Sequence, residues 1–312
     1  MMKIALLDAD TLGRDTDLSV FNEFGEFISY ETTNQKEAKE RVKDADIIIT
    51  NKVVLGQNEL ENSAVKLIAL TATGMNNIDL NYCQEQGIVV KNVAGYSTNS
   101  VAQQCFANLL ALLNHTSYYD SYCKDINGWA QSPVFVHLQA QIKELANKSF
   151  CIVGLGDIGK AVAKIASAFN ANVCYYSTSG KNANSEYKRV DFEDALKCDI
   201  ISIHAPLNEQ TRNLFDESAL KKLKDGTIIG NYGRGGIVDE EAIAKQIDER
   251  EIYYCADVLS TEPIAKDHIF LSIKHKERLL LSPHIAWASV EARKTLMHLV
   301  CENIRNFLKG IK

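Results

Sequence analysis

The chain has 312 residues, which is enough for two domains of ordinary size. Hydrophobic residues make up 46% and charged residues 24% of it, as in folded globular proteins, so a disordered or collagen-like chain is excluded. The formal net charge of −6 at pH 7, without a dense run of Lys and Arg, argues against nucleic acid as a partner.

The sequence offers no segment for a membrane or for export. Its apolar stretch 101–113 is interrupted by Gln103, Gln104 and Asn108, and is shorter than the roughly 20 residues of a membrane-spanning helix. The apolar run 4–7 near the N-terminus is too short for a signal peptide. We therefore expect a cytoplasmic protein without a membrane partner.

The eight cysteines are scattered along the chain, without a C-x-x-C pair or a compact group with histidines. In a reducing compartment such thiols usually serve as small hydrophobic side chains. We expect neither a disulfide nor a bound metal.

Residues 1–98 alternate short apolar runs with amphipathic stretches. Such alternation predicts β-α-β units and a parallel sheet, and therefore a small α/β domain. The predicted strands are residues 3–7, 47–50, 67–70 and 88–91, and the predicted helices are residues 35–43 and 80–86.

Residues 100–113 are almost continuously apolar, which predicts a helix buried between layers or domains. The next stretch, 117–148, lacks a regular pattern and is rich in aromatic residues. These aromatics could form internal core, but we expect a subunit contact, because exposed aromatics mark interfaces. They include Tyr118, Tyr119, Tyr122, Trp129 and Phe135.

A second α/β series follows and predicts a doubly wound parallel sheet of the kind that binds dinucleotides. Its expected strands are residues 149–153, 172–176, 200–204, 227–230, 253–258 and 279–282, with helices at 160–169 and 240–250. Residues 290–308 form a long amphipathic helix that cannot add a strand to this sheet. We expect this helix to pack on the first domain.

A glycine motif, G-x-G-x-x-G, occupies Gly154, Gly156 and Gly159. By itself the motif is weak, and a plain strand-turn-helix is the alternative. Here it follows an apolar strand and opens a helix, the context in which the three glycines admit a pyrophosphate at the helix N-terminus. The sequence therefore predicts a dinucleotide site.

The residue expected to bind the ribose 2′-hydroxyl is an acid about 20 residues after the glycines. At that place the chain has Ser177, Thr178 and Lys181 and no carboxylate. A carboxylate would repel a 2′-phosphate, whereas hydroxyls and a lysine accept one. We expect NADP to be used as well as NAD.

Three polar clusters follow later strands, and they contain Arg234, Glu262 and His284. Taken singly, each residue also has a purely structural explanation. Arg234 could cap a helix, Glu262 could be a solvated side chain, and His284 could be a core or surface histidine. Together they place a cation, a carboxylate and an imidazole on strand-end loops beside the predicted cofactor site, as hydride chemistry requires.

With these motifs in order, the sequence resembles the D-isomer-specific 2-hydroxyacid dehydrogenases over nearly its whole length, and most of all the glycerate dehydrogenase (hydroxypyruvate reductase) branch. The resemblance is carried by LDADTLG, TNKV, ATGMNNIDL, NVAGYSTNSVAQ, GLGDIG, HAPL, NYGRGGIVDEEAI, ADVLSTEPI and SPHIAWASVEAR. It implies a homodimer with a Rossmann-type cofactor domain at 99–284 and a smaller flavodoxin-like substrate domain at 1–98 and 285–312. The active site is expected in the cleft between the two domains.

The resemblance also implies the roles of the polar clusters. Arg234, Glu262 and His284 match the family's catalytic residues. Arg binds a substrate carboxylate with its planar fork, and a histidine beside a carboxylate is suited to donate the proton in reduction. The expected substrate contacts are Lys52, Ala72, Thr73 and Gly74.

Further cofactor contacts follow from the same motifs. Cys105 replaces a threonine common in relatives, so we expect its contact to be apolar. The other expected contacts are Asp157, Ile158, His204, Ala205, Pro206, Tyr232, Gly233, Asp257 and Trp287.

The resemblance implies reduction of a small 2-oxo acid, hydroxypyruvate or glyoxylate, to D-glycerate or glycolate. A dinucleotide-sensing regulator or corepressor on the same fold is the alternative, because a fold does not fix a function. A formate dehydrogenase is disfavoured, because that branch has Gln at the position of Glu262.

Overall fold

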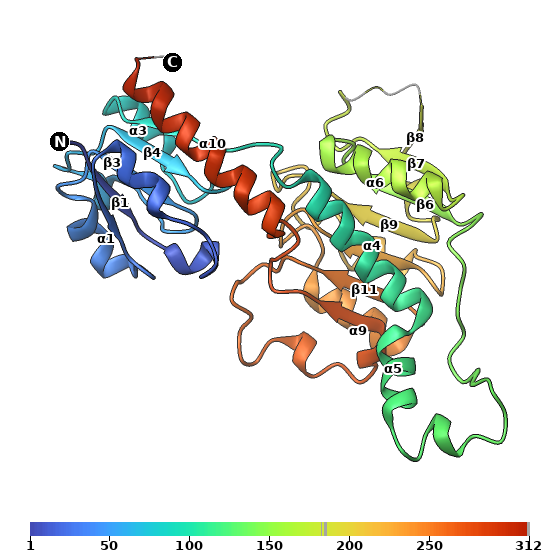
Figure 1. Ribbon diagram of the computed structural model, residues 1–312. Helices are drawn as coiled ribbons and strands as arrows, with labels where there is room; N and C mark the ends of the chain where they lie inside the picture. The colour runs from blue at the N-terminus through green and yellow to red at the C-terminus, as the bar shows by residue number, and fades with distance from the viewer. Residues whose placement is uncertain (182, 184–185, 311–312) are drawn as a thin grey trace. The chain divides into compact units, whose positions relative to one another are not determined.

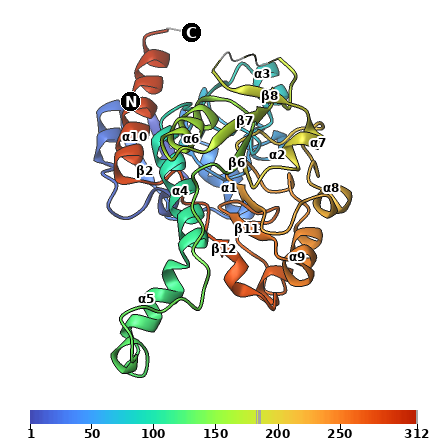
Figure 2. The same ribbon diagram turned by 90° about the vertical axis from the view of Figure 1, so that its right-hand side faces the viewer.

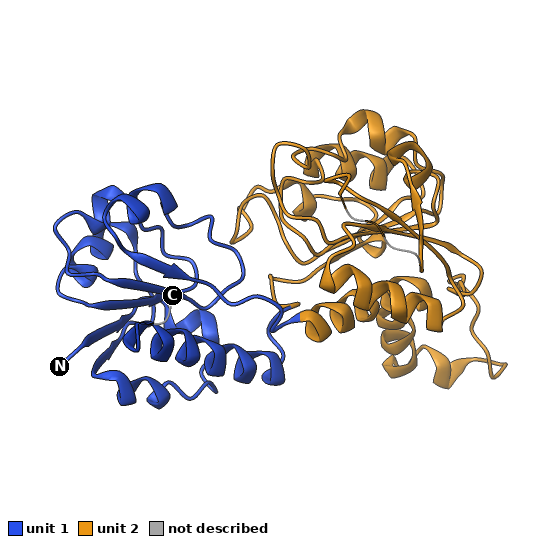
Figure 3. Cartoon of the chain, turned by 90° about the horizontal axis from the view of Figure 1, so that it is seen from above, with its two compact units in different colours: residues 1–97, 287–312 blue, residues 98–286 orange. Residues whose placement is uncertain are grey.

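The structure is a computed structural model that describes residues 1–181, 183 and 186–310. The chain divides into two compact units, unit 1 with residues 1–97 and 287–312 and unit 2 with residues 98–286 (Figure 3). Five residues of the two predicted domain ranges, 182, 184, 185, 311 and 312, lie outside the described residues.

Unit 1 contains a five-stranded parallel sheet with the strand order β2-β1-β3-β4-β5. This is the flavodoxin-like order, so the predicted fold of this domain is confirmed. The strands are β1 (Lys3–Leu6), β2 (Glu26–Ser29), β3 (Ile47–Thr50), β4 (Leu67–Leu70) and β5 (Val89–Lys91).

Both faces of this sheet are covered, as the nearly continuous apolar strands require. Ile47 and Ile49 of β3 face one hydrophobic core, and Ile48 faces the other. The first core includes Leu296 and Val300 of α10, the long helix labelled in Figure 1. The helices of unit 1 are α1 (Gln35–Val42), α2 (Gln57–Leu60), α3 (Leu80–Glu85) and α10 (Val290–Leu308), with short 3₁₀ helices at Ala9–Leu12 and Ser19–Phe24.

Unit 2 contains a seven-stranded parallel sheet with the order β12-β11-β10-β9-β6-β7-β8. The order reverses between β6 and β9, which is the switch point where doubly wound sheets bind dinucleotides. The strands are β6 (Ser149–Val153), β7 (Asn172–Tyr176), β8 (Lys188–Val190), β9 (Ile200–Ile203), β10 (Ile228–Asn231), β11 (Tyr253–Ala256) and β12 (Leu279–Leu281). The predicted Rossmann-type sheet is confirmed.

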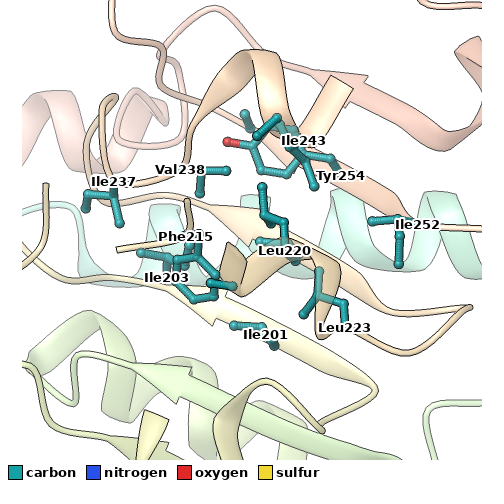
Figure 4. Close-up of a cluster of buried hydrophobic side chains, with 14 of the residues drawn as sticks. Ile201, Ile203, Phe215, Leu220, Leu223, Ile237, Val238, Ile243, Ile252 and Tyr254 are labelled. Atoms are coloured by element: carbon teal, nitrogen blue, oxygen red, sulfur yellow. The ribbon is translucent and has the colours of Figure 1, made fainter. Parts of the chain in front are cut away.

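One face of this sheet forms a large hydrophobic core. Figure 4 shows Ile203, Phe215 and Ile237 among the side chains that fill it. The helices of unit 2 are α4 (Thr98–Asn114), α5 (Thr116–Lys124), α6 (Asp157–Ala168), α7 (Phe192–Ala195), α8 (Glu217–Lys221) and α9 (Glu240–Glu249), with 3₁₀ helices at Trp129–Gln131, Ile269–Leu271 and Lys276–Arg278.

Besides the short helices α2, α7 and α8, the predictions missed two strands and one longer helix. The first sheet has β2 in addition to the four predicted strands, and the second has β8 in addition to the predicted six. Both are short edge strands with largely exposed side chains, so they lack the apolar pattern of a buried strand. The stretch predicted as irregular begins with α5, which buries none of its residues and therefore shows no apolar face.

The segment that starts with α5 projects from the sheet of unit 2 (Figure 2). Across the described part of the chain, none of the helices has the length and apolar character needed to cross a bilayer.

Candidate active site

The three predicted catalytic residues follow three neighbouring strands. Arg234 comes after β10, Glu262 after β11 and His284 after β12, and these strands are adjacent in the sheet. Because the strands are parallel, their carboxyl ends lie at one edge of the sheet. The fold therefore brings the three loops to the edge where open α/β sheets bind their ligands.

Glu262 and His284 are in direct contact. The Nδ1 atom of His284 lies 2.6 Å from Oε2 of Glu262, and the other carboxylate oxygen, Oε1, accepts a hydrogen bond of 2.9 Å from the backbone N–H of Leu259. The histidine side chain is 24% exposed and the glutamate side chain 32%. Within the described part of the chain the Nε2 atom of His284 has no hydrogen-bond partner, so it is available to a ligand.

The loop that carries His284 is held by a buried carboxylate. Asp257 accepts hydrogen bonds from the Ser282 hydroxyl at 2.6 Å and from the backbone N–H groups of Ile285 and Ala286 at 3.0 and 2.9 Å. The backbone N–H of His284 donates to the Asp257 carbonyl at 2.8 Å. His284 itself has a left-handed backbone, with φ of 54°. Asp257 thus fixes the position of the imidazole.

Arg234 is half-buried in a loop that the Asn231 side chain closes. Asn231 accepts a hydrogen bond from the Gly233 N–H at 3.1 Å and donates one to the Arg234 carbonyl at 2.9 Å. The guanidinium donates to the Gly233 carbonyl at 2.8 Å through Nη1. One edge of the guanidinium therefore bonds to its own loop. Among the described residues, the hydrogen bonds of Arg234 lie within this loop and do not reach Glu262 or His284.

A second glutamate and histidine, which sequence reasoning missed, brace the loop of Glu262. Glu240, the first residue of α9, accepts hydrogen bonds from the backbone N–H and the hydroxyl of Ser260, both at 2.7 Å. It also bonds to Nε2 of His268 at 2.9 Å. In the sequence Glu240 looks like an ordinary acidic residue in a helix's first turn, and nothing in the spacing signals its partners.

The glycine motif meets the conditions for binding a pyrophosphate. Gly154 has φ of +93°, and a Cβ there would lie 2.9 Å from the Ala205 backbone. A Cβ on Gly159 would lie 2.3 Å from the Gly154 carbonyl oxygen, whereas a Cβ on Gly156 would meet nothing within 4 Å. The first and third glycines allow close packing and the second leaves open space, as the motif requires. The residues present fit a dinucleotide.

The other predicted residues of this motif lie where the helix begins. Asp157 and Ile158 are the first two residues of α6, the former exposed and the latter half-buried. Their backbone N–H groups belong to the turn that has no intrahelical acceptor and carries the positive end of the helix dipole. This turn suits a phosphate.

Beside this loop, a chain of polar groups runs through the buried part of the sheet. The hydroxyl of Ser202 in β9 is hydrogen-bonded to Sγ of Cys105 at 3.3 Å and to Nε2 of His204 at 2.8 Å. The His204 ring stacks on Tyr232, whose hydroxyl donates to Cys255 Sγ at 3.3 Å. The polar atoms of the Tyr232 and Cys105 side chains, two predicted cofactor contacts, thus form hydrogen bonds within unit 2.

Burial sets the protonation of these groups. It raises the pKa of the Cys105 thiol to about 12 and lowers the pKa of His204 to about 3, so both side chains are neutral near pH 7. The Nδ1 atom of His204 is buried and has no hydrogen-bond partner among the described residues. Such an atom is a ready contact for a ligand group. Next to it, Ala205 packs against Gly154 and Gly233, and Pro206 is exposed.

The loop after β7 contains the predicted ribose contacts. Ser177 is buried, and its hydroxyl has no partner in the described residues. Thr178 is half-buried and Lys181 is exposed. Arg189 of β8 donates a hydrogen bond to the Gly180 carbonyl at 3.0 Å, which brings a second cation to this loop. Sequence reasoning missed Arg189 because β8 itself was not predicted.

In unit 1, a buried carboxylate organises the segment of Lys52. Asp8 accepts hydrogen bonds from the backbone N–H groups of Asn51 and Lys52 at 3.0 and 2.7 Å and from the Thr50 hydroxyl at 3.0 Å. Burial raises the pKa of Asp8 above its ordinary value, against the lowering effect of these bonds. Asp8 was not predicted, although it is the second residue of the LDADTLG motif.

The predicted substrate loop of unit 1 is tied to the strand end at residues 92 and 93. The Thr73 hydroxyl donates to the Val93 carbonyl at 2.8 Å, and the Val93 N–H donates to the Ala72 carbonyl at 3.0 Å. Gly74 is half-buried. Trp287 packs edge-on against Tyr96 within the same unit, with ring centroids 6.2 Å apart.

Comparison with known proteins identifies the family. The model of the D-isomer specific 2-hydroxyacid dehydrogenase, NAD binding domain, matches residues 106–286, a range that contains the glycine motif and the loops of Arg234, Glu262 and His284. The chain belongs to the D-isomer specific 2-hydroxyacid dehydrogenase family. This confirms the predicted family, the predicted NAD(P) cofactor and the predicted oxidoreductase class.

Individual relatives align over nearly the whole chain. The hydroxypyruvate reductase of Blautia hydrogenotrophica is 33% identical over 319 residues, covering 99% of this chain and 98% of that protein. The glycerate dehydrogenase of Methylorubrum extorquens is 32% identical over 312 residues, covering 99% and 96%. Among solved structures, an acyclic imino acid reductase in complex with NADPH and D-Arg is similar with a TM-score of 0.86 at 28% identity, covering 99% and 98%.

Proposed function

We propose that this dehydrogenase reduces a small 2-oxo acid of the hydroxypyruvate or glyoxylate type to the D-2-hydroxy acid. Relatives named hydroxypyruvate reductase, glycerate dehydrogenase and glyoxylate reductase support this substrate class. The observation that carries the proposal is the contact between His284 Nδ1 and Glu262, which leaves Nε2 for a substrate oxygen.

The proposed chemistry divides between cofactor and protein. The bound nicotinamide supplies the hydride for the carbonyl carbon. His284 supplies the proton for the carbonyl oxygen from Nε2 and takes it back in the reverse reaction. Glu262 holds the imidazole in the orientation that presents Nε2 to the substrate oxygen.

The carboxylate of the substrate needs a cationic partner, and we assign it to Arg234. The guanidinium has five N–H donors, and the bond to the Gly233 carbonyl uses one side of it. The remaining donors match a carboxylate in a two-point contact. For unit 1, we assign carboxylate binding to Lys52 and to the backbone N–H groups of residues 72–74.

The test is a turnover assay with purified protein. We expect NAD(P)H oxidation with hydroxypyruvate and glyoxylate, and a loss of kcat/KM of about 10- to 100-fold in Arg234→Lys, because a point charge cannot reproduce the fork. Tight NADH binding without turnover on a panel of 2-oxo acids would instead favour a dinucleotide-sensing regulator. Unchanged kcat/KM in Arg234→Lys would mean that another group holds the carboxylate.

We further propose that NADPH is accepted as well as NADH, with Arg189 as a contact of the 2′-phosphate. The loop after β7 lacks a carboxylate at Ser177, and its Gly180 carbonyl accepts a hydrogen bond from Arg189. An arginine beside this loop is the usual way to accommodate the 2′-phosphate. Exposed Lys181 adds positive charge.

Kinetics with both nicotinamides test this assignment. We expect Arg189→Ala to lower kcat/KM for NADPH by about 10-fold, the value of one charge-assisted contact, and to leave kcat/KM for NADH unchanged. A strong preference of the wild type for NADH, or equal losses with both cofactors, would contradict it.

We also propose that the chain forms a homodimer through the segment of residues 116–142, here called the arm. Several large apolar side chains of the arm are strongly exposed, among them Ile126 at 76%, Phe135 at 85% and Leu138 at 78%. Exposed apolar side chains concentrated on one segment favour a protein interface. The arm has internal order of its own, since Tyr122 stacks on His137 with ring centroids 3.8 Å apart.

Light scattering after size exclusion tests the dimer. We expect a dimer for the wild type and a monomer for the double variant Phe135→Asp and Leu138→Asp, because a buried unpaired carboxylate is costly. The matched control is Leu308→Asp, an exposed apolar residue outside the arm. A monomeric wild type would end this proposal.

For the compartment, we propose the cytoplasm. All eight cysteines are free thiols, and two of them, Cys174 and Cys198, have sulfur atoms only 3.7 Å apart. Thiols this close persist unoxidised where glutathione and thioredoxin keep the compartment reducing. Cell fractionation tests the cytoplasmic location. Recovery of the protein from a periplasmic or secreted fraction would contradict this proposal.

A further inference from the structure

Three thiols that are far apart in the sequence meet in unit 2. Cys151 lies in the middle of β6 and Cys174 in the middle of β7, and the two are direct partners in the register of these strands. Cys198 follows α7, just before β9. The three Sγ atoms all lie within 4.8 Å of one another.

The spacing of the sulfurs matches a metal thiolate site. A metal bonded to three sulfurs at about 2.3 Å in one plane separates the sulfurs by about 4.0 Å. The Sγ atoms of Cys174 and Cys198 are 3.7 Å apart, and the third lies within the same 4.8 Å limit. Small side-chain rotations are therefore enough to place all three sulfurs on one ion.

The burial of the group suits a permanent, protected ion. Cys151 is completely buried and Cys198 is 6% exposed, whereas Cys174 is only half-buried and leaves a path for entry. The side chains belong to the hydrophobic core on one face of the sheet. Within the described residues the group consists of thiols alone, without a histidine or a carboxylate.

We propose that Cys151, Cys174 and Cys198 form a binding site for one thiophilic monovalent d¹⁰ cation, Cu(I), with three sulfur ligands. Soft thiolates select Cu(I) and Zn²⁺ among biological metals, and a structural Zn²⁺ site needs a fourth protein ligand that this group does not offer among the described residues. The ion ties β6 and β7 to the segment before β9. Because Cys151 and Cys174 lie in mid-strand and Cys198 lies just before the start of β9, all three are away from the carboxyl ends of the strands, and the site is structural and separate from the proposed chemistry.

Anaerobic titration of the full-length, reduced protein with Cu(I), buffered by a chromogenic chelator, tests the site. We expect one equivalent to bind and X-ray absorption to count three sulfur neighbours at about 2.3 Å. Binding releases protons from the thiols, and it raises the Tm because only the folded chain presents the site.

Two variants separate the site from unspecific thiol binding. Cys174→Ser, which changes one atom at a half-buried position, is expected to weaken Cu(I) binding by more than about 100-fold. Cys123→Ser, at an exposed thiol outside the group, serves as the matched control and should bind as the wild type does. Equal affinity of Cys174→Ser and the wild type would overturn the proposal. So would fewer than three sulfur neighbours in the wild-type spectrum, a result that does not depend on whether any variant folds.

Discussion

Two glutamate–histidine pairs of unit 2 differ in how many nitrogens of the imidazole are engaged in hydrogen bonds. Glu240 and His268 are 10% and 11% exposed, and Glu262 and His284 are 32% and 24% exposed. In the first pair, Nε2 of His268 bonds to Glu240, and Nδ1 accepts the N–H of Phe270. In the second pair, only Nδ1 of His284 is engaged within the described residues.

The difference separates a structural pair from a chemical one. An imidazole whose two nitrogens are both bonded has no position left for a substrate, so the first pair can only hold its loop. An imidazole bonded through Nδ1 alone is oriented and still has a reactive nitrogen. The residue types are the same in both pairs. What distinguishes His284 is its Nε2 atom, which is left for a substrate.

Removing each imidazole in turn tests whether His284 and His268 have different roles. We expect His284→Ala to lower kcat for hydroxypyruvate reduction by about 10²- to 10⁴-fold, the usual contribution of a general acid. His268→Ala should keep kcat near the wild-type value. Near-normal turnover in His284→Ala would refute its role, and equal losses in both variants would mean that the two pairs do not differ.

The carboxylates provide the next test. Glu262→Gln removes the charge behind His284 and leaves an amide that can turn either its oxygen or its NH2 group toward Nδ1, so the ring is held less firmly in its wild-type orientation. We expect a loss in kcat of about 10²-fold, as for other small misplacements of a reacting group. Glu240→Gln is the matched control and should mainly lower the Tm. A larger kcat loss in Glu240→Gln than in Glu262→Gln would reverse the assignment.

Stability measurements test the structural role of the first pair, Glu240 and His268. His268→Ala leaves the Glu240 carboxylate with one hydrogen-bond donor fewer at a mostly buried position, so we expect unfolding to become easier by about 1–3 kcal/mol. His275→Ala breaks a surface pair with Glu277 and should cost less than about 1 kcal/mol. Urea titrations of both variants measure these values. Equal losses in the free energy of unfolding for the two variants would show that burial of the Glu240–His268 pair adds nothing to stability.

Another histidine of unit 2, His204, is a buried imidazole without a carboxylate partner. Burial lowers its pKa in the folded protein to about 3, whereas the unfolded chain has a pKa near 6.5. Between these values the unfolded state binds a proton that the folded state does not, so stability falls as the pH drops from about 6.5 towards 3. We expect His204→Asn to show a shallower fall than the wild type in urea titrations from pH 7 to pH 4. Parallel curves would contradict this.

Local sequence patterns predicted most of the fold because buried strands are nearly all apolar. The predicted ranges 149–153 and 172–176 coincide with β6 and β7, and 290–308 coincides with α10. The missed strands β2 and β8 are short, lie at sheet edges and leave most of their side chains exposed, so neither has the long apolar run of a buried strand. Helix α5 was missed for the same reason, since it buries no side chain.

The candidate site was predictable where a motif carries its own chemistry. Gly154, Arg234, Glu262 and His284 stand in recognisable contexts at strand ends. Contacts between distant residues were not predictable, because they follow from register and loop packing. Glu240 meets His268 28 residues away, and Cys151 meets Cys174 only through the pairing of β6 with β7.

Chemical rescue tests the proton donor most directly. The measurement is the rate of hydroxypyruvate reduction by His284→Ala at saturating NADH and increasing concentrations of added imidazole near pH 6.5. We expect a rate that rises with the imidazolium concentration in this variant and stays flat in the wild type. A rate independent of imidazole in a variant that still binds NADH would contradict the assignment of His284 as the acid.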